Sequence, residues 1–122
     1  MKLPLKLTLA AALLAPLPAL AHHSYAMFDM TKNVMLKGSV VKFKWQNPHS
    51  WIELDVPVSG KNERWAIEAT APANLVQEGW KRTSLKPGDR MRIWVHPLRS
   101  GARGASYVGV RLPDGSTLGD VS

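Results

Sequence analysis

The sequence predicts a mostly β fold, a small five-stranded barrel of the OB type with one short helix. Five short segments alternate apolar with polar residues, which is the pattern of half-buried strands. A segment with helical spacing separates the third of them from the fourth. This order of elements, within about 80 residues, matches the OB barrel. A half-open sandwich has the same order and is the alternative.

The first 21 residues are expected to be a signal peptide. Lys2 and Lys6 give a basic start, residues 7–20 are apolar, and Ala19-Leu20-Ala21 is a small-x-small cleavage site. The apolar run is shorter than the span of about 20 residues that a membrane helix needs. Cleavage near Ala21 would leave a periplasmic or secreted chain that begins at His22.

Three parts are expected after the signal peptide. Residues 22–33 show neither a strand period nor a helix period and form an N-terminal arm, whose apolar side chains should pack along the barrel or cover a partner site. Residues 34–118 form the barrel, and residues 119–122 are a frayed C-terminus. The chain has no cysteine, so no disulfide supports this domain.

The first three strands are expected over residues 34–45, 51–56 and 64–69. The first two form a hairpin, because apolar residues alternate with polar ones in both and Asn47-Pro48 interrupts the run between them. Gly38 is the expected position of a bulge or bend, since glycine inside a strand commonly marks one.

The helix is expected to start at Thr70 as its N-cap, with Pro72 in the first turn, and to stop at Gly79. Residues 90–96 form the fourth strand. Residues 107–112 form the fifth, with three side chains toward the core: Val108, Val110 and Leu112.

The charge balance is basic. The whole chain has 16 basic and 9 acidic residues, a net charge of +7, and loss of Lys2 and Lys6 with the signal peptide leaves +5. Such a balance suits an anionic partner, but it also confers solubility. Nucleic-acid binding is not expected, because the basic residues are scattered and only four approach a cluster: Arg90, Arg92, Arg99 and Arg103.

Several motifs together indicate a family. The mature start reads HHSYAMFD, the centre reads WQNPHSW over residues 45–51, and later motifs are Gly79-Trp80, SLKPGD, HPLR and LPDG. In these motifs the chain resembles a family of small exported bacterial proteins of unknown function. The resemblance covers nearly the whole mature chain. It implies export and a single domain, and it implies no particular activity.

Four histidines suggest a metal site. At a free N-terminus, His22 would present its α-amine and imidazole together, which can chelate Cu(II), and His23 would add a second imidazole. His49 and His96 lie at ends of expected strands, where a barrel mouth could bring them near the arm. The leading hypothesis is an exported binding or accessory protein that takes copper, or another soft or borderline metal, through these histidines.

Three methionines could serve as thioether ligands of copper, but they could equally be structural residues. Thioethers favour Cu(I), and the candidates are Met27, Met30 and Met35. Methionine also fills gaps in cores, and two histidines after a leader can be merely a polar start. The histidines show no H-x-H or H-x-x-x-H spacing.

The alternative is a metal-free module for a periplasmic partner protein or a small ligand. Its surface would consist of aromatic and arginine side chains: Trp45, Trp51, Trp94, Arg92 and Arg99. Period two places Trp51 and Trp94 on the outer face of the barrel, where the arm or the helix could instead cover them. Trp65 and Trp80 are expected in the main core.

No motif with catalytic spacing is present, so the chain is not expected to be an enzyme. His49 and Ser50 are adjacent in the chain, and adjacent side chains on a strand point to opposite faces. A nucleophile and its base must lie within hydrogen-bond reach of each other, which this pair would not.

Overall fold

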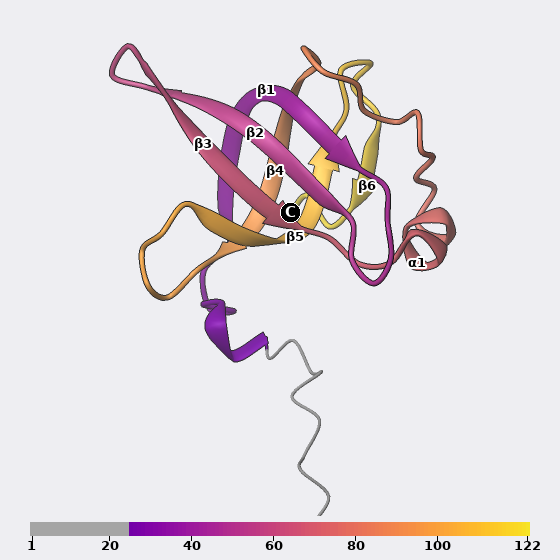
Figure 1. The fold of residues 1–122 in the computed structure, drawn as a ribbon, viewed down its shortest axis with the longest axis horizontal. Helices are drawn as coiled ribbons and strands as arrows, with labels where there is room; N and C mark the ends of the chain where they lie inside the picture. Colours follow the sequence, from indigo (N-terminus) through magenta and orange to yellow (C-terminus); the bar gives the residue numbers. More distant parts are fainter. Residues whose placement is uncertain (1–24) are drawn as a thin grey trace, which may run out of the picture.

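The computed structural model describes residues 25–122, which form a six-stranded sheet rolled into a barrel (Figure 1). The strands are β1 (Val34–Lys44), β2 (Trp51–Val58), β3 (Lys61–Glu68), β4 (Arg90–Pro97), β5 (Gly104–Arg111) and β6 (Thr117–Gly119). The helix α1 (Pro72–Gln77) lies between β3 and β4, and a 3-10 turn, η1 (Tyr25–Met27), opens the described chain. The predicted order of five strands and one helix is confirmed.

Pairing between β3 and β5 closes the barrel. The strand order is β3-β2-β1-β4-β5-β6, and all neighbours in this order are antiparallel. The closing pairs are parallel and join Ala66 to Gly104, Ile67 to Ala105, and Glu68 to Ser106. The predicted five-stranded barrel is therefore confirmed, and the half-open sandwich is excluded because its two edge strands would stay unpaired.

The core follows the predicted alternation, since every second residue of a strand faces the interior. Six apolar side chains from four strands have no exposed surface: Ile52, Leu54, Ile67, Ile93, Val95 and Val110. Trp80 is buried as predicted. Trp65, also predicted in the core, is half-buried against it. Trp51 and Trp94 lie on the outer face and are half-buried.

β1 meets β2 closely at Gly38. A Cβ atom there would lie 2.3 Å from the carbonyl oxygen of Asp55, so glycine is required for this approach. The register between β1 and β2 shifts between Val40 and Lys42, which places the bulge there. Of the two expectations for Gly38, a bulge or a bend, the bulge lies instead at the following residues, and the glycine serves the close contact with β2.

α1 has the predicted ends but not the predicted cap. Its N-cap is Ala71, which makes no side-chain cap hydrogen bond, and Pro72 takes the first turn as expected. The Thr70 hydroxyl instead accepts a hydrogen bond from Asn74 Nδ2 at 2.9 Å. Gly79 follows the helix with φ of +101°, the left-handed conformation that favours glycine at this place.

A bulge in the β4–β5 pairing changes which β5 side chains face the core. The register shifts between Trp94 and Val95, which leaves Val108 as an extra residue on β5. Tyr107 therefore packs against the core, whereas Val108 lines an outer pocket. The expected inward position of Val108 is wrong, although Val110 is fully buried as predicted.

The C-terminal residues are paired and not frayed. β6 pairs with the end of β5, and the Asp120 N–H donates to the Val108 carbonyl at 3.1 Å. The chain end then reaches the start of β1, where Asn33 Nδ2 donates to the Ser122 carbonyl at 3.3 Å. In the sheet order β4 lies between β5 and β1, so the chain end connects the two strands that flank β4.

The arm packs against one end of the barrel, below it in Figure 1. Phe28 is buried and forms a β-bridge with Leu98. The Arg99 N–H donates to the Met27 carbonyl at 2.9 Å. The apolar arm is thus attached along the side of the domain from Tyr25 onward.

The predicted signal peptide, its cleavage site and the first residues of the arm, His22 and His23 among them, lie outside the described residues. Between residues 25 and 122, no helix is long and apolar enough to cross a membrane.

Candidate functional site

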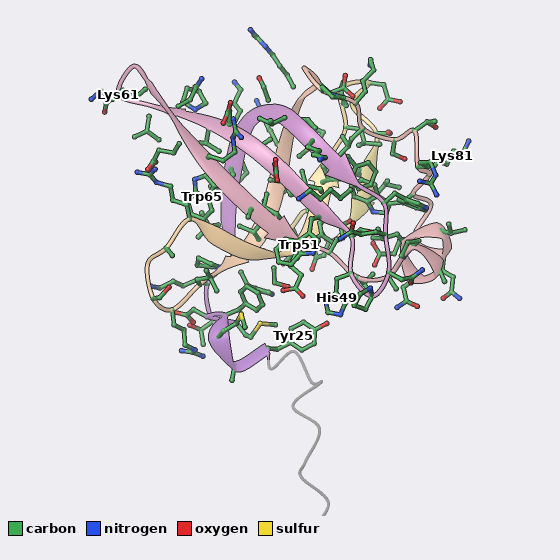
Figure 2. All side chains as sticks on the ribbon, in the orientation of Figure 1. Tyr25, His49, Trp51, Lys61, Trp65 and Lys81 are labelled. Atoms are coloured by element: carbon green, nitrogen blue, oxygen red, sulfur yellow. The ribbon has the colours of Figure 1, made fainter. Side chains whose placement is uncertain are left out.

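A pocket of about 260 Å³ lies between the arm and the adjacent end of the barrel. Its wall includes six side chains from the arm, the β1–β2 turn and three strands: Tyr25, Met30, His49, Glu68, His96 and Tyr107. Figure 2 shows Tyr25 and His49 at this same end of the molecule. A cavity of this size suits a metal ion or a small ligand better than a drug-sized molecule.

Barrel closure places four residues in one row across the sheet. Trp51 on β2 pairs with Glu68 on β3, Glu68 pairs with Ser106 on β5, and Ser106 pairs with His96 on β4. Side chains directly opposite one another on paired strands project from the same face. Glu68, Ser106 and His96 therefore line the pocket together, on the outer side of the barrel wall.

The β1–β2 turn adds His49 to this row. His49 Nδ1 contacts Glu68 Oε1, and the two side chains are 26% and 9% exposed. Two backbone hydrogen bonds hold the turn against the end of β3: Ser50 N–H to the Thr70 carbonyl at 3.1 Å, and Ala69 N–H to the Ser50 carbonyl at 2.8 Å. The imidazole thus gives the largely buried carboxylate the polar partner that burial requires.

His96 is held by the arm. Its Nδ1 lies 2.7 Å from the carbonyl oxygen of Lys32. A carbonyl oxygen only accepts, so in the neutral ring Nδ1 carries the proton and Nε2 is the basic nitrogen. In both His49 and His96 an oxygen atom contacts Nδ1, and Nε2 is therefore the atom through which either ring could bind a metal.

Tyr107 contributes a hydroxyl that stays protonated. Trp80 Nε1 donates to the Tyr107 hydroxyl at 3.1 Å, and that hydroxyl donates to Glu78 Oε2 at 3.2 Å. Burial raises the pKa of Tyr107 far above its ordinary value, and the nearby Glu78 carboxylate raises it further, while the Trp80 hydrogen bond lowers it. Tyr107 is consequently a neutral polar wall of the pocket and not a source of charge.

Two of the four predicted metal ligands, His49 and His96, line the same pocket, and the thioether of Met30 lines it as well. Met27 and Met35 are exposed and are not part of this wall. Within the described part of the chain, no group of three or more His, Cys, Asp or Glu side chains is arranged to hold a metal ion. A complete metal centre at this pocket would need ligands from the preceding residues.

The predicted aromatic and arginine surface is distributed over several places. Trp45 packs against the core, and Trp51 is half-buried at the β2 end of the row that contains Glu68, Ser106 and His96. Arg99 Nε donates to a carbonyl of the arm at 3.1 Å and so holds the arm. Trp94 is half-buried on the outer face of β4, and Arg92 lines a groove at the other end of the strands.

Glu68, Ser106 and Tyr107 line the pocket but were not assigned to a site from the sequence. Glu68 occupies an outward position of an alternating strand, where a carboxylate usually faces water, and its contact with His49 arises only from the β2–β3 register. Tyr107 faces the pocket and the core because of the β5 bulge. The sequence signal that could have indicated Glu68 is its place at the end of a strand, just before the pattern changes from strand to helix spacing.

A family model covers most of the chain. The model of a family of unknown function (DUF6152) matches residues 11–107, which run from before η1 into the middle of β5. The chain belongs to this family. A search of curated proteins finds no match, and neither does a search of solved structures. The predicted membership of an uncharacterised family is confirmed, and because DUF6152 carries no assigned activity, a function must be argued from the pocket itself.

Proposed function

We propose that this DUF6152 protein is an exported binding protein that takes a copper ion at the pocket beneath its arm. His49 and His96 supply two imidazole ligands from the barrel. His22 and His23 complete the site once the signal peptide has been removed, with the α-amine of His22 as a further nitrogen ligand. Nitrogen ligands of this kind suit Cu(II), and the Met30 thioether suits Cu(I).

The observation that carries the proposal is the way in which the two pocket histidines are held. His49 Nδ1 contacts the Glu68 carboxylate, and His96 Nδ1 contacts the Lys32 carbonyl. Metal-binding histidines almost always donate their second ring N–H to a carboxylate or a backbone carbonyl, which fixes the ring and raises the basicity of the ligating nitrogen. Two rings with this pattern on one pocket support binding of a metal through Nε2.

The length of the chain favours a contribution from the arm. Tyr25 lines the pocket, and only two peptide units separate it from His23. Because consecutive Cα atoms are about 3.8 Å apart, the Cα of His23 stays within about 8 Å of the Tyr25 Cα. This short connection to a residue that lines the pocket supports a contribution from the mature start.

The test is a Cu(II) titration of the chain that begins at His22, followed by tryptophan fluorescence and by electron paramagnetic resonance. A matched chain with three additional Ala residues ahead of His22 retains every side chain but moves the free amine away from both His22 and His23. We expect one equivalent of Cu(II) to bind the mature chain at least about tenfold more tightly than the extended chain, a difference of about 1.4 kcal/mol.

A second variant, His96→Gln, tests the barrel ligands. The glutamine amide can still donate to the Lys32 carbonyl, so the attachment of the arm is retained while a ligating nitrogen is lost. We expect the spectrum of bound Cu(II) to show fewer nitrogen ligands in this variant. Identical affinities and spectra for the mature, extended and His96→Gln chains would refute the proposal, because copper would then bind elsewhere.

A further inference from the structure

A second concave surface lies at the opposite end of the same strands. It is an open groove of about 730 Å³, flanked by the β2–β3 hairpin and by the turn between β5 and β6 (Figure 1). Four basic side chains from three neighbouring strands line it: Lys37, Arg90, Arg92 and Arg111. The groove lined by these four side chains is called the cationic groove below. The first pocket uses the end of β4 and the start of β5, whereas this groove uses the start of β4 and the end of β5.

Three of the four cations stand in one row. Lys37 on β1 pairs directly with Arg92 on β4, and Arg92 pairs directly with Arg111 on β5. Since neighbouring strands lie about 4.8 Å apart, the row places three positive charges along about 10 Å. Arg90 stands two residues from Arg92 on β4, and therefore on the same face.

This arrangement does not serve the fold. Like charges directly opposite one another on paired strands destabilise a sheet. Within residues 25–122, none of the four cations forms an ion pair or a side-chain hydrogen bond. The groove contains one carboxylate, Asp55, but Arg64 Nε and Nη2 bind it at 2.6 and 3.3 Å. The four cationic side chains are thus available to bind an anion that is not part of the chain.

The shape of the groove favours a small ligand over a macromolecule. Its volume lies within the range of small-molecule sites, about 300–1,000 Å³. No aromatic side chain lines it, whereas surfaces that bind single-stranded nucleic acid stack bases on aromatic rings. Of its apolar side chains, Met91 is buried and Leu112 is half-buried. Pro57 and Pro113 are exposed, but neither is a large apolar or aromatic side chain of the kind that inserts into a bilayer.

We propose that the cationic groove binds a small molecule that carries two or more phosphate or sulfate groups. Adjacent guanidinium groups bind such oxyanions through paired, charge-assisted hydrogen bonds, and a row of three cations matches several linked anions better than a single one. This site is independent of the copper pocket, since the two use different ends of β4 and β5.

The test is isothermal titration calorimetry of the mature chain with sodium tripolyphosphate at an ionic strength of about 0.15 M, where the Debye length is about 8 Å. Arg92→Glu reverses the central charge of the row, and Lys81→Glu makes the same charge change at an exposed side chain beside α1, outside the groove (Figure 2). We expect R92E to weaken tripolyphosphate binding by at least about tenfold and K81E by less than about twofold, because exposed distant charges are screened.

Folding of R92E is checked by urea denaturation. The introduced carboxylate faces Lys37 and Arg111 in register, so the unfolding midpoint should equal or exceed that of the unaltered chain. Sucrose octasulfate and vesicles of phosphatidylglycerol serve as further probes, and binding of the soluble sulfate separates a free ligand from a lipid headgroup. The proposal is overturned if tripolyphosphate does not bind, if R92E and K81E weaken it equally, or if only the vesicles or a single-stranded DNA oligonucleotide bind.

Discussion

Replacement of Tyr107 by Phe removes one oxygen atom that two partners share. Trp80 is 2% exposed, and its indole N–H donates to the Tyr107 hydroxyl at 3.1 Å. The same hydroxyl donates to Glu78, which is exposed and can turn to water. Y107F therefore leaves one buried donor, Trp80 Nε1, without an acceptor, while the loss at Glu78 is small.

The expected cost follows from that orphaned donor. A buried polar group without a partner costs about 1–3 kcal/mol, so Y107F should lower the free energy of unfolding by that amount near pH 7. Tyr25→Phe is the matched control, because Tyr25 is 62% exposed and the same atom is removed there. Y25F should change the free energy of unfolding by less than about 0.5 kcal/mol.

The loss of unfolding free energy caused by Y107F should be smaller at alkaline pH. Burial, the main cause, raises the pKa of Tyr107 above the value of about 10 that the unfolded chain has, so the folded protein keeps a proton that the unfolded chain releases. The stability that this hydroxyl contributes is complete below about pH 10 and falls as the pH rises toward the folded pKa. At pH 10.5 the difference between the unaltered chain and Y107F should be smaller by up to about 0.8 kcal/mol.

Urea unfolding of the unaltered chain, Y107F and Y25F at pH 7.5 and at pH 10.5 measures both effects. The comparison with Y107F removes the contribution of lysines, which titrate in the same range in both chains. Equal stabilities of Y107F and Y25F at pH 7.5 would refute the role given to the Trp80 hydrogen bond. A difference that grows with pH would refute the sign of the Tyr107 pKa change.

Two further predictions concern packing. Gly109→Ala would place a Cβ atom 2.0 Å from the Asp120 carbonyl oxygen. Amides of residues 117–122 should therefore lose protection from hydrogen exchange, while those of β1 and β4 keep it. Unchanged protection of residues 117–122 would contradict their pairing with β5. Leu75→Ala should cost about 2–5 kcal/mol in urea unfolding because Leu75 is fully buried, whereas its neighbour Val76→Ala, at 56% exposure, should cost less than about 0.5 kcal/mol. Equal losses for these two would contradict the docking of α1 through Leu75.

The sequence was sufficient for the barrel because the relevant signals are local. Alternation in residues 51–56 and 90–96 fixes which side chains face inward, and Pro72 and Gly79 mark the helix ends. The wrong predictions concern elements whose structure depends on a segment that is distant in the sequence. β6 is three residues long, too short for a periodic pattern, and forms because β5 offers it an edge.

The candidate site was only partly predictable for the same reason. That His49 and His96 end strands was visible in the sequence, and both line one pocket. The Glu68 partner of His49 depends on the register between β2 and β3, and the Lys32 partner of His96 depends on where the arm lies. One inserted residue in either strand would turn these side chains to the other face, and no local pattern reports such a register.

In β4, inward and outward side chains alternate, so the residues that stabilise the core are different from those that line the candidate sites. Its inward residues include Ile93 and Val95, which have no exposed surface, and its outward residues include Arg92 and His96, which line the two candidate sites. Arg92 and His96 are four positions apart on an extended strand, about 13 Å, so a ligand at one does not touch the other. H96Q should therefore leave tripolyphosphate binding intact, and R92E should leave copper binding intact. If either variant abolishes both, the two surfaces are coupled through the fold, and the assignment of separate sites on one strand fails.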